Sequence, residues 1–194
     1  MTNGTLILGG KEIITKEDLP SLKNVQKLII NEGVVQLDND IFECLAKLEE
    51  VELPSSLEII GDGCFEDCKS LKKISLNDNL QSIGKFTFRG CNALECITIP
   101  SHVLFIQDST FMDCTSLKYV TLMEGLKQIE GRAFYNCCSL SSVTFPKSLV
   151  KLDTQCFGHC LSLNSVILQG KVTACPDAFY SCPLLDKSKL VADI

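Results

Sequence analysis

The sequence has 194 residues, of which 45% are hydrophobic and 22% are charged, and its formal net charge is −6 at pH 7. This length supports one domain with a sizeable core, and this composition excludes a disordered chain. No run approaches the roughly 18 apolar residues of a membrane-spanning helix, and the negative charge does not favour binding to nucleic acid or an anionic membrane.

The first eleven residues contain neither a basic segment nor the apolar run of a secretory signal peptide, because the segment 6–8 is too short. We therefore expect a cytoplasmic protein, with a cell-surface or secreted location as the alternative if the sequence is part of a longer protein. Charge is uneven along the chain. Residues 31–70 hold eleven acids against two lysines, which predicts an acidic N-terminal region.

Short strands are expected from the N-terminus onwards. Leu6 and Leu8, and then Leu28 and Ile30, alternate with other residues as in a strand with one buried face. These residues occupy the positions of a weak version of the repeat that follows. We therefore interpret residues 1–41 as degenerate N-terminal capping repeats.

From residue 42 to residue 185 a unit of 23 residues repeats. A phenylalanine marks each unit, with a last interval of 22 residues: Phe42, Phe65, Phe88, Phe111, Phe134, Phe157 and Phe179. Three residues after each of the last six phenylalanines stands a cysteine: Cys68, Cys91, Cys114, Cys137, Cys160 and Cys182. Leucine or another aliphatic residue fills further columns. Residues 186–194 remain as a C-terminal cap or tail.

The unit reads L-x-x-L-x-L, as in residues 117–122, and the alternation at its end predicts a short strand. Pro54, Pro100 and Pro146 follow three of these strands and should end strand pairing because proline lacks an N–H group. One unit cannot bury its apolar face alone, so neighbouring units must stack. The expected fold is an α/β-type repeat solenoid forming a single domain, 1–194. It is a right-handed coil with a concave parallel sheet of about eight short strands and a mostly irregular or short-helical convex side.

These units resemble the BspA-like, or Treponema-type, class of leucine-rich repeats. The resemblance rests on stretches such as A-F-Y-N-C-C-S-L at 133–140 and V-T-F-P-K-S-L at 143–149, and it covers about residues 20–185. It implies a curved parallel-sheet solenoid with a binding role, often in cell-surface adhesion by bacteria and parasitic protists.

The cysteines that recur with the repeat are expected to be small, buried and reduced core residues, since free cysteine is among the most buried residue types. A disulfide between adjacent units is the geometric alternative, because strands in a sheet lie about 4.8 Å apart. Cys156, His159 and Cys160 could be read as metal ligands, but two of them occupy core positions of the repeat, so we expect no metal site. Cys96 should be the most exposed thiol.

No catalytic motif is present, and the two histidines, His102 and His159, fall in different parts of the repeat. We therefore expect no enzymatic activity and no cofactor. The leading prediction is a protein-binding scaffold, monomeric and without membrane insertion or a nucleic-acid partner. The alternative is a surface or secreted adhesin domain that binds a host protein.

Binding is expected on the concave side, where residues between the buried strand positions point outwards. Two rows carry these side chains: Glu52, Ser75, Thr98, Thr121, Thr144 and Ile167 form one, and Glu50, Lys73, Cys96, Tyr119, Ser142 and Ser165 form the other. The surface is predicted to run from acidic to hydroxyl-rich, with Tyr119 as its only aromatic anchor. A rival convex patch of Ile59, Phe86 and Phe105 places apolar side chains where other units have polar ones.

Overall fold

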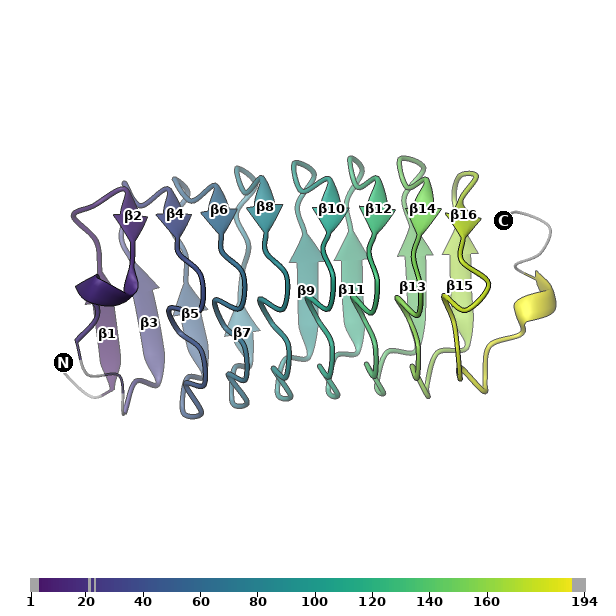
Figure 1. Ribbon diagram of the computed structural model, residues 1–194, viewed down its shortest axis with the longest axis horizontal. Coiled ribbons are helices and arrows are strands. Elements are labelled where there is room, and N and C mark those ends of the chain that lie inside the picture. Colours follow the sequence, from purple (N-terminus) through teal and green to yellow (C-terminus); the bar gives the residue numbers. More distant parts are fainter. Residues whose placement is uncertain (1–3, 21, 23, 190–194) are drawn as a thin grey trace.

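The computed structural model describes residues 4–20, 22 and 24–189, which form a rod of eight stacked coils that follow one another in chain order along its length (Figure 1). Each coil contributes one strand to the long-strand face: β1 (Thr5–Leu8), β3 (Lys27–Ile30), β5 (Glu50–Glu52), β7 (Lys73–Ile74), β9 (Cys96–Ile99), β11 (Tyr119–Leu122), β13 (Ser142–Phe145) and β15 (Ser165–Leu168). We number the coils 1 to 8 after these strands. All pairings are parallel, as predicted.

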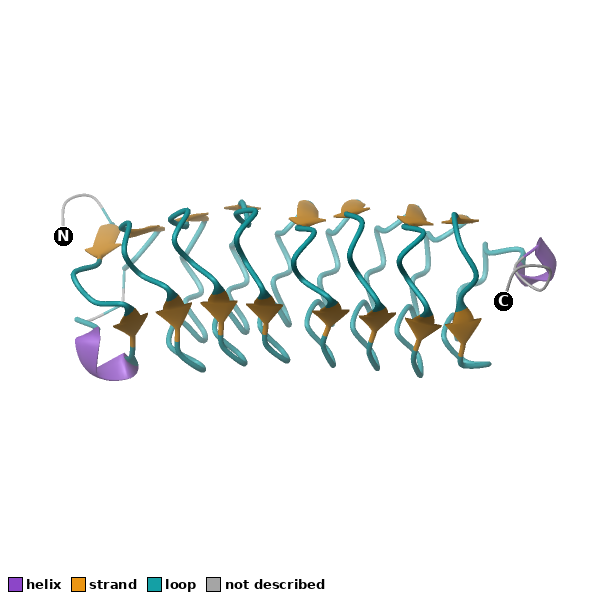
Figure 2. Ribbon diagram, turned by 90° about the horizontal axis from the view of Figure 1, so that it is seen from above, coloured by secondary structure: helices purple, strands orange, loops and turns teal. Residues whose placement is uncertain are grey.

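A second row of two-residue strands lies on the opposite side of the rod (Figure 2) and is called the short-strand face. Its strands are β2 (Ile13–Ile14), β4 (Gln36–Leu37), β6 (Ile59–Ile60), β8 (Ser82–Ile83), β10 (Phe105–Ile106), β12 (Gln128–Ile129), β14 (Lys151–Leu152) and β16 (Thr173–Ala174). Of the irregular or short-helical side that was predicted, the helical alternative is therefore wrong, and the irregular one holds apart from these two-residue strands. Among the described residues, helix is limited to two 3-10 turns, η1 (Lys16–Asp18) and η2 (Lys187–Lys189).

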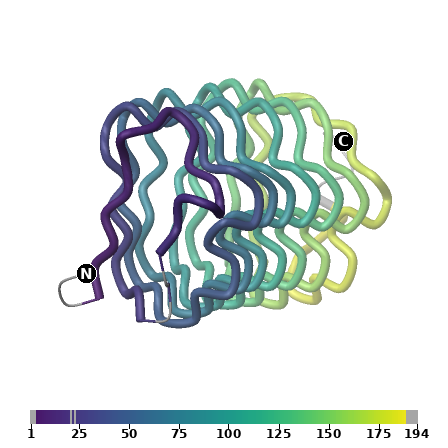
Figure 3. The backbone as a smooth tube through the Cα atoms, turned by 60° about the vertical axis from the view of Figure 1, so that its left-hand side comes forward, coloured from purple at the N-terminus to yellow at the C-terminus, as the bar shows by residue number. Residues whose placement is uncertain are grey.

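The third flank of coils 2 to 8 carries the phenylalanine, and its backbone conformation explains why no helix forms there. Residues two before and two after the phenylalanine adopt left-handed backbone, for example Arg132 (φ 54°) and Asn136 (φ 60°) around Phe134. Such residues interrupt a right-handed helix. The peptide groups bond to the next coil instead, as Phe111 N–H does to the Ala133 carbonyl at 2.7 Å. Figure 3 shows the resulting superposition of coil on coil.

The core is one continuous cluster that follows the repeat columns along the rod. The phenylalanine rings form a stack, with centroids 5.0–5.6 Å apart from Phe42 to Phe134 and on through Phe157 to Phe179. This spacing suits offset stacking of aromatic rings, so each interior ring stabilises two neighbours.

Burial of the six recurring cysteines is confirmed, and the structure gives their thiols a specific partner. Each Sγ donates to the carbonyl oxygen of the phenylalanine one coil earlier, as Cys114 does to Phe88 at 3.1 Å. The same contact recurs in every coil from Cys68 to Cys182, at 3.0–3.3 Å. The thiol can add a second hydrogen bond to a buried carbonyl, since the Phe88 oxygen, for example, also accepts from the Cys91 backbone N–H at 3.1 Å. Burial raises the pKa of the Cys68 thiol to about 12, so this group stays protonated.

The ladder of the long-strand face is not continuous. Full four-residue pairing joins β1 to β3, β9 to β11 and β13 to β15. Pairing shortens to three residues at β3–β5 and two at β5–β7, and within the described chain β7 does not pair with β9, nor β11 with β13. Figure 1 shows wider spacing at these two junctions, which we call the 4–5 seam and the 6–7 seam.

Both seams lie at junctions where a proline follows the strand of the later coil. At the three fully paired junctions, the residue after the later strand donates its N–H to the earlier coil: Asn31 to Leu8 (2.8 Å), Met123 to Ile99 (3.2 Å) and Gln169 to Phe145 (3.3 Å). The corresponding residues of coils 3, 5 and 7 are Pro54, Pro100 and Pro146, which have no N–H. Pro54 coincides with the shortened β3–β5 ladder, Pro100 with the 4–5 seam and Pro146 with the 6–7 seam.

Side chains replace the missing backbone bonds at two of the three proline junctions. Glu124 in coil 6 accepts from the backbone N–H groups of Lys147 (3.0 Å) and Ser148 (3.1 Å), and Gly125 N–H donates to Ser148 Oγ (2.9 Å). Gly125 has φ 119°, and a Cβ there would lie 2.0 Å from the Ser101 carbonyl oxygen, so glycine is required.

Glu32, Gly33, Ser55 and Ser56 form the same acid clamp between coils 2 and 3. The 4–5 seam has no such clamp among the described residues. Its corresponding contact is His102 Nδ1, which lies 2.7 Å from the Asp78 carbonyl oxygen. The short-strand ladder is also interrupted there, between β8 and β10, so the 4–5 seam is open on two flanks of the rod.

Candidate functional site

The twelve residues predicted to line the binding face all lie on the long-strand side of the rod. Strand register places them in two rows, with Tyr119 beside Cys96, Thr121 beside Thr98, and Thr144 beside Ile167. Ten of the side chains are exposed and two, Glu50 and Ser165, are half-buried. Their predicted orientation is thus confirmed, whereas their role in binding remains a prediction. The rod is almost straight in Figures 1 and 2, so this face is nearly flat along its axis rather than deeply concave.

The rows extend further towards the N-terminus than the sequence prediction placed them. Lys27 is the register partner of Glu50, and Ile29 is that of Glu52, while Thr5 and Ile7 precede them on β1. The alternating pattern of residues 27–30 indicates these outward positions, but the sequence prediction used only its buried residues, Leu28 and Ile30. Ile7 is exposed, so this end of the face is partly apolar.

The N-terminal part of the face is electrically balanced rather than acidic. Lys73 Nζ donates to Glu50 at 2.7 Å, and Lys27 pairs with both Glu50 (3.4 Å) and Glu52. The hydrogen bond from Lys73 lowers the pKa of the Glu50 carboxyl, and that to Glu52 raises the pKa of Lys27. Two acids matched by two lysines leave little local field to attract a basic partner, so the predicted acidic character is wrong for this part of the face.

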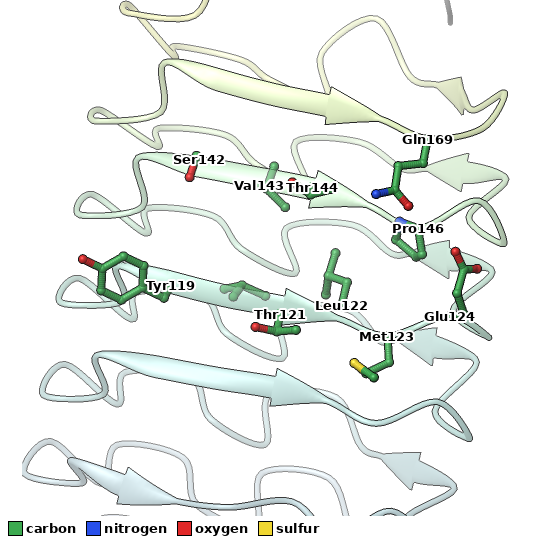
Figure 4. Close-up of a pocket in the computed structure, with 11 residues that line it drawn as sticks. Tyr119, Thr121, Leu122, Met123, Glu124, Ser142, Val143, Thr144, Pro146 and Gln169 are labelled. Atoms are coloured by element: carbon green, nitrogen blue, oxygen red, sulfur yellow. The ribbon is translucent and has the colours of Figure 1, made fainter.

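The 6–7 seam opens a groove on the long-strand face, the first groove (Figure 4). Tyr119 lies at the start of β11, Met123 and Glu124 follow its end, and Ser142 and Thr144 face them from β13. Val120 is only partly buried, whereas Ile97 and Val143 at the same strand position are buried. The floor of the groove is therefore core surface that neighbouring strands leave uncovered.

The 4–5 seam forms a second groove on the same face, lined by Ile74, Ser75 and Leu76 on one side and by Cys96, Ile97 and Thr98 on the other. Tyr119 and Thr121 border both grooves. The paired strands β9 and β11 thus form a two-strand ridge between two grooves. With 67% of its surface exposed, Tyr119 is the most exposed of the large apolar side chains.

The structure does not bring the sequence-predicted thiol and metal candidates together into a site. Cys156 and Cys160 are buried, and Cys160 Sγ donates to the Phe134 carbonyl. His159 lies between the rings of Tyr135 (5.0 Å) and Tyr180 (5.5 Å). The described residues contain no cluster of three or more His, Cys, Asp or Glu side chains suited to a metal ion. Cys96 is exposed, as predicted, and Cys44 is as well.

The rival patch on the other side is only partly as predicted. Ile59 and Phe105 are exposed, but Phe86 is half-buried in left-handed backbone (φ 58°), and the Arg89 guanidinium lies 6.0 Å from its ring centroid. Leu104, which the sequence prediction did not include, is exposed next to Phe105. These two side chains border a third groove, where β8 and β10 separate on the short-strand face.

Fold and repeat together define a leucine-rich-repeat solenoid. The model of the BspA-type leucine-rich repeat region (6 copies) matches residues 10–118 and 83–194, and the chain belongs to this family. No protein of curated function matches the sequence. No helix among the described residues is long and apolar enough to cross a membrane.

Solved structures of bacterial leucine-rich repeat proteins are similar to this chain. The Treponema pallidum leucine-rich repeat protein has TM-score 0.80 and 26% identity, covering 97% of this chain and 87% of that one. A leucine-rich cell surface protein of Faecalibacterium prausnitzii has TM-score 0.71 and 27% identity, covering 75% of this chain. A leucine-rich repeat protein from Bacteroides ovatus has TM-score 0.68 and 24% identity, and the match covers 84% of this chain. At this identity, the similarity supports the fold alone. This chain spans only 39% and 48% of the last two proteins.

Proposed function

We propose that this chain is a non-enzymatic protein-binding module that contacts its partner through the ridge of β9 and β11 on the long-strand face. One observation carries the proposal: among the described residues, Tyr119 is the most exposed of the large apolar side chains, and it stands between two grooves at unpaired strand edges. Family membership supports it, because leucine-rich repeats generally mediate protein interactions.

The chemistry of the ridge suits a protein partner. Tyr119 offers a large apolar area with a polar tip and loses little rotamer entropy on binding. Thr98, Thr121 and Ser142 supply neutral hydroxyl groups around it. Unpaired strand edges beside each groove offer backbone hydrogen bonds, the feature that makes exposed sheet edges bind other chains. The two histidines lie apart, His102 at the 4–5 seam and His159 between two tyrosines, which agrees with a non-catalytic role.

The test begins with a partner recovered on the immobilised chain and purified, whose affinity is then measured by titration calorimetry. Replacing Tyr119 with alanine should weaken binding by about 1–3 kcal/mol, as for an interface hot spot, without loss of stability because the side chain is exposed. Exchange of Glu50 and Glu52 for lysine should have a smaller effect, mainly on association rate, because both acids are already paired.

Phe105→Ser is the matched control, since it removes an exposed aromatic ring from the opposite face. Normal binding by the Tyr119 variant together with loss of binding by the Phe105 variant would move the site to the short-strand face.

A surface adhesin that binds a host protein is the second candidate. The observation that favours it over the cytoplasmic scaffold is similarity to a protein described as a cell surface protein, although this chain spans only 39% of that one. Sequencing the complete open reading frame separates the two. An export signal or a surface anchor supports the adhesin, and a reading frame bounded by residues 1 and 194 supports the cytoplasmic scaffold.

A further inference from the structure

The short-strand face carries a periodic row of exposed apolar side chains. Five large apolar residues there are 37–54% exposed: Ile13, Ile59, Leu104, Phe105 and Val150. They lie on coils 1, 3, 5 and 7 only, so the exposed apolar groups recur every second coil, about 9.6 Å apart at the usual strand spacing. The even coils have Gln36, Ser82 and Gln128 in the strand position of Ile59 and Phe105.

We propose that this face is a self-association surface, on which a second copy of the chain packs antiparallel about a two-fold axis at the 4–5 seam. The axis would run parallel to the strands, at the middle of the eight coils, so that coil n of one copy faces coil 9−n of the other. Every odd coil then faces an even one. Apolar side chains of one copy fit opposite the smaller or polar residues of the other, for example Phe105 opposite Ser82.

Charge complementarity selects the antiparallel arrangement. Glu58 in coil 3 precedes β6 just as Lys127 in coil 6 precedes β12, so the two-fold operation brings them face to face twice. Neither residue has an ion-pair partner within the described chain, and Glu58 only accepts a neutral hydrogen bond from Gln81 at 3.0 Å. Val35 of coil 2 would meet Val150 of coil 7. A parallel pair would instead set coil 3 against coil 3 and coil 6 against coil 6, so Glu58 and Lys127 would not meet and neither would gain an ion-pair partner.

The size of the face predicts a weak dimer. Eight coils at about 4.8 Å and a width of about four residues give on the order of 500 Å² for each copy, near the lower limit for a specific interface. This inference does not depend on the proposed function, because the two long-strand faces would point outwards on opposite sides. The dimer would then present Tyr119 twice.

Sedimentation equilibrium of the full chain over a concentration series tests the proposal. The wild type should be a reversible dimer. Glu58→Lys and Lys127→Glu alone should each weaken it about 10-fold or more, since each creates two repulsive contacts. The double variant should regain most of the wild-type affinity, because both pairs are restored with reversed sign. Phe105→Asp should give monomer with an unchanged circular dichroism spectrum.

Two controls separate this surface from the others. Lys69→Glu makes the same charge change outside the short-strand face, and Tyr119→Ala alters the long-strand face; neither should affect dimerisation. A monomer at every concentration overturns the proposal and leaves Leu104 and Phe105 to a different protein. A dimer whose double charge variant stays as weak as the single ones overturns the antiparallel arrangement.

Discussion

Replacing Pro146 with alanine should close the 6–7 seam with little change in stability. The new N–H would lie opposite the Leu122 carbonyl, as Met123 N–H lies 3.2 Å from that of Ile99 one coil earlier. One such bond contributes about 0.5–1.5 kcal/mol. Loss of proline costs about 0.4–1 kcal/mol through the greater freedom of the unfolded chain. The two terms nearly cancel, so the free energy of unfolding should change by less than about 1 kcal/mol.

The informative readout is therefore local. Amide hydrogen exchange should slow in segments 118–123 and 141–146, because both strands acquire ladder partners. A crystal structure of the variant should show β11 paired with β13 and the first groove narrowed. Met123→Pro is the reciprocal variant and should open a seam between β9 and β11, which are fully paired in the native chain. Unchanged exchange in both variants would refute proline as the origin of the seams.

Two further predictions concern the stacking of coils. In urea denaturation, Phe111→Leu should lower the free energy of unfolding by about 0.5–1.5 kcal/mol more than Phe42→Leu does. The reason is that Phe111 stacks on two rings, at 5.4 and 5.1 Å, whereas Phe42 stacks on one. Equal losses for the two variants would contradict a contribution from stacking. Glu124→Gln should lower the denaturation midpoint at pH 7 relative to the wild type. The hydrogen bond from the Lys147 backbone lowers the pKa of the Glu124 carboxyl below its ordinary 4.5, so the carboxylate stabilises the fold above that pH and loses this contribution as pH falls through the lowered value. The difference in denaturation midpoint between wild type and variant should thus shrink in acid. Glu17→Gln is the control. A difference that stays constant with pH, or that equals the difference for Glu17→Gln, would show that the clamp does not act through the charge of Glu124.

The coil arrangement and the outward rows could be predicted from sequence because both follow from one repeated pattern. Once the phenylalanines fix the 23-residue register, alternation in the strand decides which side chains are buried and which are outside. The second ladder could not be predicted in the same way. Pairs such as Ile59–Ile60 are too short to show a period of two, and their pairing depends on contact with coils that are distant in sequence.

The charge of the binding face was mispredicted for a related reason: residues that are neighbours in space are far apart in sequence. Glu50 and Glu52 lie in a segment rich in acids, and counting within that segment omits Lys27, one coil earlier. In a solenoid, the neighbours of a side chain are found about 23 residues away. Net charge along the chain therefore predicts local surface charge poorly. Pro100 and Pro146 were recognised as ends of strands, but their effect on the preceding coil emerged only when the ladder donors at Met123 and Gln169 were identified.

Two periods are combined in this chain, and they have different physical origins. The core repeats every 23 residues, because each of coils 2 to 8 supplies a phenylalanine to the stack and each of coils 3 to 8 supplies a thiol to the carbonyl of the coil before it. The surface repeats every 46 residues. Pro54, Pro100 and Pro146 lie on odd coils, as do the exposed apolar residues of the short-strand face, while the acid clamps begin on even coils.

Buried columns cannot alternate without leaving cavities in the stack, whereas outward positions can alternate at little energetic cost. Surface residues can therefore vary with the 46-residue period, and this variation produces the grooves and the exposed apolar rows. We infer that a partner recognises features that recur with this longer period. The 4–5 seam is where its features coincide. There a proline lacks an acid clamp, both ladders are interrupted, and exposed aromatic side chains lie beside grooves on both faces.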